Sequence, residues 1–246
     1  MESNRLTTQE FWENTRAQNY FKRQDAGHGI DEFIKKYVPV TDQASVIEIG
    51  SYPGPHLATF GDLGYELNGV DFCKDNAVGL PGWLKNEGFK VGQFEACDFF
   101  EYKQDRLFDV VCSFGFIEHF NNYEEIIIKH ALLVKPQGYL VITTPNFRGL
   151  VQYLLHKYFD ENNLALHNVK SMCPDKWSEL LSDMGYEIKY AGYFGGFWFW
   201  RGEEQLSYLK RKILWLLERV IPRLRKLLWF ESSFFSAYCG IVAVKK

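Results

Sequence analysis

The sequence predicts an α/β protein with a doubly wound, mostly parallel sheet of seven strands and helices on both faces. Three observations predict this fold. Apolar segments of strand length alternate with longer segments of helical period, an order that implies right-handed crossovers between parallel strands. The segments FDVVCSFG (108–115) and GYLVITTP (138–145) are apolar nearly throughout, as strands buried on both faces are. With 46% hydrophobic and 17% aromatic residues, the 246-residue chain can bury a substantial core.

The elements follow in order along the chain. Two segments of helical period, near 7–24 and 29–38, precede the first strand. The last two strands flank a long insertion instead of a compact helix, which predicts an antiparallel edge strand. Strands are expected at 45–50, 66–71, 90–98, 108–115, 138–145, 186–194 and 238–246, and the later helices at 54–63, 75–87, 121–134, 174–185 and about 203–230.

The chain contains no internal repeat, low-complexity tract or linker, so we expect a single domain over residues 1–246. Its parts are the N-terminal helices (1–40), a ligand-binding core (41–195), a helical insertion or lid (196–236) and the last strand (237–246).

Charge and cysteine content restrict the class of protein. The net charge of −3 gives no overall positive field, so nucleic acid is not an expected partner. The five cysteines are odd in number and lack CxxC spacing, which indicates a reducing compartment without disulfides or structural zinc. The polar N-terminus does not resemble a signal peptide, and no apolar run reaches the roughly 18 residues of a membrane span. We therefore expect a cytoplasmic protein.

The loop after the first strand indicates a ligand site. In SVIEIGSYPGPHLATF (45–60), the acid Glu48 precedes Gly50 and Gly54, which allow the backbone to approach a ligand closely. The helix that follows favours an anionic group at its N-terminus, whereas Glu48 can accept hydrogen bonds from an ammonium group or from hydroxyls. This combination suits a zwitterion better than a pyrophosphate. The dinucleotide motif GxGxxG is absent.

These residues resemble the class I S-adenosylmethionine-dependent methyltransferases, whose first motif is an acid followed by GxGxG. Here the motif reads EIGSYPG, with Tyr52 where the middle glycine usually stands. Further stretches match in register: NGVDFCKDN, FEACDFFEY, FDVVCSFGFIEHF, and LLVKPQGYLVITTPN with Gln137 in place of a glycine. The resemblance covers about residues 40–195 and the last strand, in the small-molecule and quinone O-methyltransferase branch.

The resemblance implies a Rossmann-like methyltransferase fold and the cofactor S-adenosylmethionine, with S-adenosylhomocysteine as product. It implies that Asp71 holds the two ribose hydroxyls, that Phe72 lies against the adenine and that Asp98 contacts the adenine amino group. The cofactor-binding residues expected from it are Glu48, Gly50, Ser51, Tyr52, Gly54, Asp71, Phe72, Cys97, Asp98, Phe99, Ser113 and Phe114.

Catalysis requires an acceptor held close to the activated methyl group, and a hydroxyl acceptor benefits from a base. His119, which follows Glu118 after the fourth strand, is one candidate; packing is its alternative role. His167 is the second candidate, because similar O-methyltransferases carry a histidine in this segment. Glu118 is expected to orient a histidine or, as in some quinone methyltransferases, to contribute to a divalent-metal site; no residue is assigned as a metal ligand. His28, His56, His130 and His156 show no constellation in the sequence.

The insertion at 203–230 has helical period. It reads as an interfacial helix on an anionic membrane or as a helix packed on the protein, with Pro222 expected to kink or split it. Its predicted apolar face is Leu206, Leu209, Ile213, Leu216, Val220, Leu224 and Leu227, opposite the basic residues Lys212, Arg219, Arg223 and Lys226.

The favoured function is therefore methyl transfer to a small-molecule, glycan or lipid-linked acceptor, most readily at oxygen. The insertion and residues 147–173 would cover the acceptor, and the protein would then work at the inner face of a membrane. Two alternatives stay open: a non-catalytic cofactor-binding or membrane-peripheral scaffold, and a nicotinamide-dependent oxidoreductase. The sequence does not define the acceptor or the oligomeric state.

Overall fold

The structure is a computed structural model that describes residues 4–16, 21–103, 106–202, 205–227 and 230–246. The side chains of Pro222 and Arg225 also lie outside this description.

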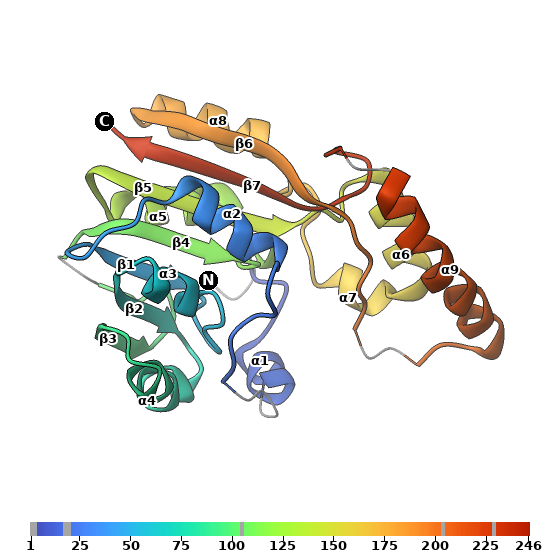
Figure 1. Cartoon of the computed structure of the whole chain (residues 1–246), viewed down its shortest axis with the longest axis horizontal. Helices are drawn as coiled ribbons and strands as arrows, with labels where there is room; N and C mark the ends of the chain where they lie inside the picture. Colours follow the sequence, from blue (N-terminus) through green and yellow to red (C-terminus); the bar gives the residue numbers. More distant parts are fainter. Residues whose placement is uncertain (1–3, 17–20, 104–105, 203–204, 228–229) are drawn as a thin grey trace.

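In the described part of the chain, seven strands form one sheet in the order β3-β2-β1-β4-β5-β7-β6 (Figure 1). The first five strands run parallel, whereas β7 is antiparallel to both β5 and β6. The seven strand predictions and the antiparallel pairing at this end of the sheet are confirmed. The strands are β1 (Ser45–Ile49), β2 (Glu66–Asp71), β3 (Val91–Ala96), β4 (Phe108–Phe114), β5 (Val134–Pro145), β6 (Tyr186–Phe197) and β7 (Ser236–Lys245).

Helices cover both faces of the sheet, as predicted. One face packs against α2, α3 and α4, around buried side chains such as Ile34, Phe60 and Leu80. The other face packs against α5 and α8, around Ile127 and Trp177. These helices are α2 (Gly29–Tyr37), α3 (Leu57–Asp62), α4 (Gly79–Asn86), α5 (Tyr123–Leu132) and α8 (Pro174–Asp183).

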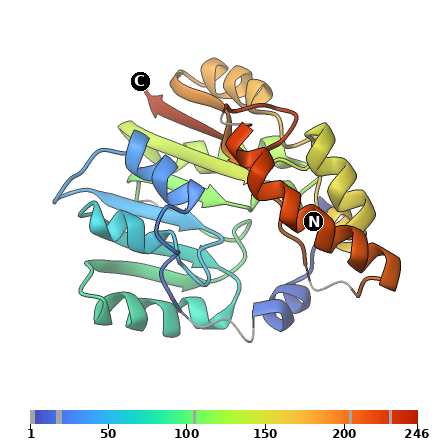
Figure 2. The same cartoon turned by 45° about the vertical axis from the view of Figure 1, so that its right-hand side comes forward.

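The remaining helices lie at the carboxyl ends of the parallel strands. The predicted helix 7–24 is seen only as α1 (Gln9–Arg16). Residues 21–24 are not helical, so that part of the prediction is wrong, and residues 17–20 lie outside the described residues. Figures 1 and 2 show α6 (Leu150–Phe159), α7 (Glu161–Ala165) and α9 (Tyr208–Leu227) as a group that projects beyond the sheet. Neither α6 nor α7 was predicted as a separate helix, nor were two single turns, η2 (Lys74–Asn76) and η3 (Ile117–His119).

Helix α9 differs from its prediction in two respects. It continues as one helix through Pro222, so the expected split is wrong. Among its described side chains Leu214 and Ile221 are buried, and Ile221 packs against Phe197 and Phe235 of a small satellite core. The predicted apolar face is therefore not the most buried one, because Leu217 and Ile221, which do not belong to it, pack against the satellite core. Leu209, Leu216, Leu224 and Leu227 of that face are exposed.

Gln137 adopts a positive φ of 63°, the left-handed conformation that favours glycine. It stands where similar sequences carry a glycine, so the fold keeps the tight turn with a residue that adopts it less readily. Within the described residues, we find no helix that is both long and apolar enough to cross a membrane.

Candidate functional site

The loop after β1 approaches the end of β2 closely. Gly50 and Gly54 have φ values of 75° and 78°, and the Gly50 N–H donates to the Val70 carbonyl at 2.8 Å. A Cβ atom at Gly50 would lie 2.6 Å from the ring of Phe116. Only glycine fits this position without displacing that ring, so a narrow space is kept open between the ends of β1 and β4.

Asp71, the last residue of β2, is buried, and its carboxylate joins this loop to the loop that follows β2. Its Oδ1 accepts from the Cys73 N–H at 2.8 Å, and its Oδ2 accepts from the Tyr52 N–H at 3.3 Å. The Ser51 hydroxyl adds a buried bond of 2.7 Å to Asn76 Oδ1. The predicted acid at the end of β2 is thus placed against the predicted glycine loop.

Gly50, Asp71 and Phe72 line one small pocket, so three predicted cofactor residues come together. The other wall comes from the segment after β4, and the N-terminal segment covers the top. Residues not predicted from the sequence complete the pocket, namely Arg5, Thr7, Trp12, Gly115, Phe116 and Phe120, together with the candidate base His119.

Arg5 occupies the part of this site next to Asp98. Its guanidinium forms an ion pair with Asp98 Oδ1 and lies 5.8 Å from the ring centre of Phe72. It also lies over the rings of Phe100 and Phe120, at 5.2 and 5.3 Å. A planar cation between aromatic rings and a carboxylate is stabilised by both contacts. The predicted contact of Asp98 with adenine therefore requires this pair to open.

The other predicted cofactor residues lie around this pocket or beneath it. Glu48 is buried in β1, and Phe114 at the end of β4 packs on the α2–α3 face against His56, with ring centres 4.9 Å apart. Phe99 and Ser113 are buried, Phe99 in the core beside His130. The half-buried Cys97 packs against the same core, and burial raises its pKa.

The three predicted catalytic residues meet beyond the end of β4. One possible metal-ligand atom each of Glu118, His119 and His167 lies within 4.8 Å of the other two. The Nδ1–H of His119 donates to the Leu166 carbonyl at 2.9 Å, and that of His167 donates to the Asn163 carbonyl at 2.7 Å. These bonds leave the Nε2 of each neutral ring as the unprotonated nitrogen.

Burial sets the charge of this group. It raises the pKa of the Glu118 carboxyl to about 8 and lowers the pKa of His167 to about 4. Both residues are therefore neutral near pH 7. Glu118 Oε2 is buried without a hydrogen-bond partner in the described structure. A carboxylate beside two imidazole nitrogens is also a donor set for a divalent metal ion, the alternative role that the sequence left open for Glu118.

Two further pairs correct the expectation that the other histidines have no constellation. His56 Nδ1 lies 2.7 Å from Asp31 Oδ1, with His28 beside it. His156 Nδ1 lies 2.9 Å from Asp160 Oδ2 in a fully buried pair. The His156–Asp160 pair shows the i, i+4 spacing of one helical turn and was visible in the sequence. His56 and Asp31 are 25 residues apart and meet only because α2 packs beside α3.

Comparison with protein families gives one match over most of the chain. A family model described as "Methyltransferase domain" matches residues 18–191. The ubiquinone biosynthesis O-methyltransferase of Rickettsia canadensis is 26% identical over 166 residues, which cover 65% of this chain and 70% of the relative. The enzyme of the same name from Rickettsia prowazekii is 27% identical and is aligned over 65% of each chain.

Solved structures share the fold. A SAM-dependent methyltransferase from Archaeoglobus fulgidus has a TM-score of 0.56 and 22% identity, covering 88% of this chain and 93% of its own. Phosphoethanolamine N-methyltransferase 2 of Haemonchus contortus, in complex with S-adenosyl-L-methionine, has a TM-score of 0.56 and 16% identity. That match covers 95% of this chain and 56% of the other.

The raised pKa of Glu118 predicts a pH-dependent stability. The folded state holds this proton up to about pH 8, whereas an unfolded glutamate releases it near pH 4.5. Wild-type stability should therefore fall as pH rises between these values. Glu118→Gln has no ionisable group at this position, so its free energy of unfolding does not show this decrease. The free energy of unfolding of the variant minus that of the wild type should therefore increase by on the order of 1 kcal/mol for each unit that the pH rises. Urea unfolding at pH 5.5, 6.5 and 7.5, with a chelator present, measures this difference. A difference that stays constant with pH would contradict the prediction.

Proposed function

The chain belongs to the methyltransferase domain family, and we propose that it transfers a methyl group from S-adenosylmethionine to a hydroxyl oxygen of a small apolar molecule. The cofactor supplies a methyl group that its positively charged sulfur has already activated. What the chain must add is binding, orientation and removal of the hydroxyl proton.

The observation that carries the proposal is the position of Asp71. This carboxylate ends β2, borders the pocket with Gly50 and Phe72, and offers two acceptor oxygens to a pair of neighbouring hydroxyls. The space that Gly50 leaves beside Phe116 admits a group that any other side chain would exclude. We assign these residues to the ribose and the amino-acid chain of the cofactor, and Phe72 with Asp98 to its base once Arg5 moves away.

Transfer to oxygen is supported by the two named Rickettsia relatives, both called ubiquinone biosynthesis O-methyltransferases. The roles of Glu118, His119 and His167 in catalysis stay a prediction. Its support is that His119 lines the pocket with Asp71 and that Glu118 and His167 lie directly behind it.

Formation of methylated product tests the proposal directly. The protein is incubated with S-adenosylmethionine and a series of alkyl-substituted catechols, and both the methyl ether and S-adenosylhomocysteine are quantified by mass spectrometry. We expect equal amounts of the two products. S-adenosylhomocysteine binding without turnover on any hydroxyl compound would favour the scaffold alternative. Family membership decides against the nicotinamide-dependent alternative.

Replacing Asp71 should weaken nucleoside binding. Asp71→Asn keeps the shape but removes the charge and one acceptor, so we expect S-adenosylhomocysteine affinity to fall roughly 10- to 100-fold, the loss expected from one charge-assisted hydrogen bond. Isothermal titration calorimetry measures the affinity. Asp75→Asn, an exposed acid four residues later, is the matched control and should bind as wild type does. Unchanged affinity in a folded Asp71→Asn protein would refute the assignment.

We also propose that α6 and α9 place the enzyme on an anionic membrane, where a lipid-linked or prenylated acceptor is available. The outer surface of these helices carries many apolar side chains. Those that are at least 36% exposed are Leu150, Val151, Tyr153, Leu154 and Tyr158 on α6 and Tyr208, Leu209, Trp215, Leu216, Leu224 and Leu227 on α9.

Positive charge lies beside this apolar surface. Helix α9 has one acid, Glu218, in its 20 residues. Its exposed basic residues are Arg211, Lys212, Arg219, Arg223 and Lys226. An exposed apolar surface bordered by basic side chains is typical of helices that lie in the headgroup region of anionic bilayers. Figure 1 shows α9 standing away from the sheet, so its outer side is open to such a surface.

Vesicle binding tests the membrane proposal. We expect the protein to sediment with phosphatidylglycerol-containing vesicles at low salt, and less at high salt because the basic residues are screened. The triple variant Leu209→Ser, Trp215→Ser, Leu216→Ser should bind at least about tenfold more weakly, since three apolar groups no longer enter the bilayer.

The matched control removes the same number of exposed apolar side chains elsewhere on the molecule. Val40→Ser, Val78→Ser, Leu132→Ser alters residues that are 78%, 75% and 62% exposed and lie outside α6 and α9. This variant should bind vesicles as wild type does. An equal loss of vesicle binding in both triple variants, or no vesicle binding by the wild-type protein, would refute the proposal.

A further inference from the structure

A second group of ionisable side chains lies on the opposite face of the sheet from Glu118 and His167. His28 precedes α2, Asp31 lies in its first turn, and His56 directly precedes α3. Asp31 and His56 are buried, and a possible ligand atom of each of the three residues lies within 4.8 Å of the other two. His56 packs against Phe114, so the group lies at the carboxyl end of β4.

Hydrogen bonds to Nδ1 of each ring determine where the two neutral imidazoles carry their protons. The Asp31 carboxylate can only accept, so His56 Nδ1 carries the proton in their 2.7 Å bond and His56 Nε2 has the lone pair. His28 Nδ1 accepts the Ile30 N–H at 3.3 Å, so a neutral His28 carries its proton on Nε2. Burial and the neighbouring His56 lower the pKa of His28, which favours this neutral form.

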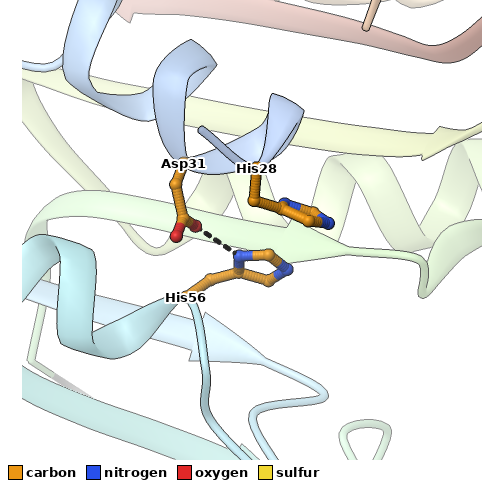
Figure 3. Close-up of side chains that lie close together, drawn as sticks. All are labelled: His28, Asp31 and His56. Carbon is orange, nitrogen blue, oxygen red and sulfur yellow. Dashed lines mark hydrogen bonds and ion pairs between the residues drawn. The ribbon is translucent and has the colours of Figure 1, made fainter. Parts of the chain in front are cut away.

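The two outer nitrogens therefore form one donor and one acceptor. Figure 3 shows them on the same side of the group, turned away from Asp31. The ring centres are 5.4 Å apart, which allows one oxygen atom between the rings to reach both outer nitrogens. A hydroxyl group both donates and accepts one hydrogen bond through its oxygen, so it matches this pair.

The neighbouring space suits an aromatic or apolar molecule. His28 forms part of the wall of an open cavity of about 770 Å³ between α2 and the ends of β6 and β7. That volume is within the range of small-molecule sites. Aromatic side chains dominate its lining, among them Phe33, Tyr190, Phe194, Trp198 and Tyr238.

We propose that His28 and His56 bind the hydroxyl group of the methyl acceptor, with His56 as the base that takes its proton and Asp31 as the residue that positions His56. This inference rests on the proposed function. The acceptor's O–H bond breaks and its proton passes to His56 Nε2. The oxygen bonds to the methyl carbon as that carbon's bond to sulfur breaks, which leaves a neutral thioether. The proton leaves His56 to water after the products have formed.

Asp31 supplies His56 with a carboxylate partner, whereas Nδ1 of His167 is bonded to a backbone carbonyl. A carboxylate stabilises the imidazolium that forms when a histidine takes up a proton, whereas a backbone carbonyl does so less. The ionisable groups around the two rings are Asp31 from α2, Asp25 from the preceding loop and Tyr238 from β7. Asp25 and Asp31 both favour a positive charge on His28, and burial opposes it.

The test uses 4-nitrocatechol, whose ionised form absorbs at longer wavelength than its neutral form. It is added to the full-length protein saturated with S-adenosylhomocysteine, at a pH where the free compound is mostly neutral. We expect the bound probe to show the spectrum of the ionised form in the wild type. His56→Gln should bind the probe without producing the spectrum of its ionised form. His28→Gln should weaken probe binding about tenfold, and Asp31→Asn should produce the ionised spectrum only at higher pH.

The matched control is Glu187→Gln, an exposed acid of β6 outside the cavity lining that pairs with Lys189 and should leave the spectrum unchanged. The proposal is overturned if the wild-type protein leaves the probe neutral, if His56→Gln keeps the change, or if a chelator abolishes it, because a metal ion would then be the acid. It is also overturned if His119→Gln or His167→Gln alone removes the change. S-adenosylhomocysteine binding is measured in the same samples. Its absence would refute the methyltransferase proposal, whereas its presence without ionised probe refutes the hydroxyl site alone.

Discussion

The site depends on one buried carboxylate at the end of β2. Asp71 accepts from the N–H of Tyr52 in the loop after β1 and from the N–H of Cys73 in its own loop, so it joins two loops that parallel strands bring to one edge. Parallel pairing of β1 with β2 places Gly50 against Val70. Without that pairing, Asp71 would be a solvated acid at a strand end. With it, a charged acceptor stands beside a backbone that has no side chain in the way.

The N-terminal segment adds a second constraint. Arg5 pairs with Asp98 and lies among the rings of Phe72, Phe100 and Phe120, while Trp12 packs against His119 with ring centres 5.0 Å apart. A purine and this guanidinium would use the same carboxylate and the same ring faces. Arg5 therefore occupies the place that the base of the proposed cofactor would take, and a ligand that displaced Arg5 would also alter the cover over the pocket.

The sequence pattern was sufficient to predict the features of the fold and of the site that depend on a single strand or a single loop. Alternation of apolar runs gave all seven strands, and the position of Asp71 after ELNGV placed it at the carboxyl edge. Contacts that depend on how helices pack were not predictable in the same way. His56 meets Asp31 only through the packing of α2 beside α3, and Arg5 reaches Asp98 across 93 residues. Helix α9 shows the same limit, because its 3.6-residue period could not show which side would meet Phe197 and Phe235.

Two histidine groups lie on opposite faces of the sheet, and the partner of Nδ1 distinguishes them chemically. In His167 a backbone carbonyl holds Nδ1 and burial lowers the pKa to about 4, so this imidazole takes up a proton only at a cost. Within the His28, Asp31 and His56 group, a carboxylate holds Nδ1 of His56 and offsets the charge that protonation creates. The aromatic cavity also lies on the side of this second group. The α2 face therefore pairs an imidazole with a carboxylate, whereas the Glu118 face has the chemistry of a neutral cluster or a metal site.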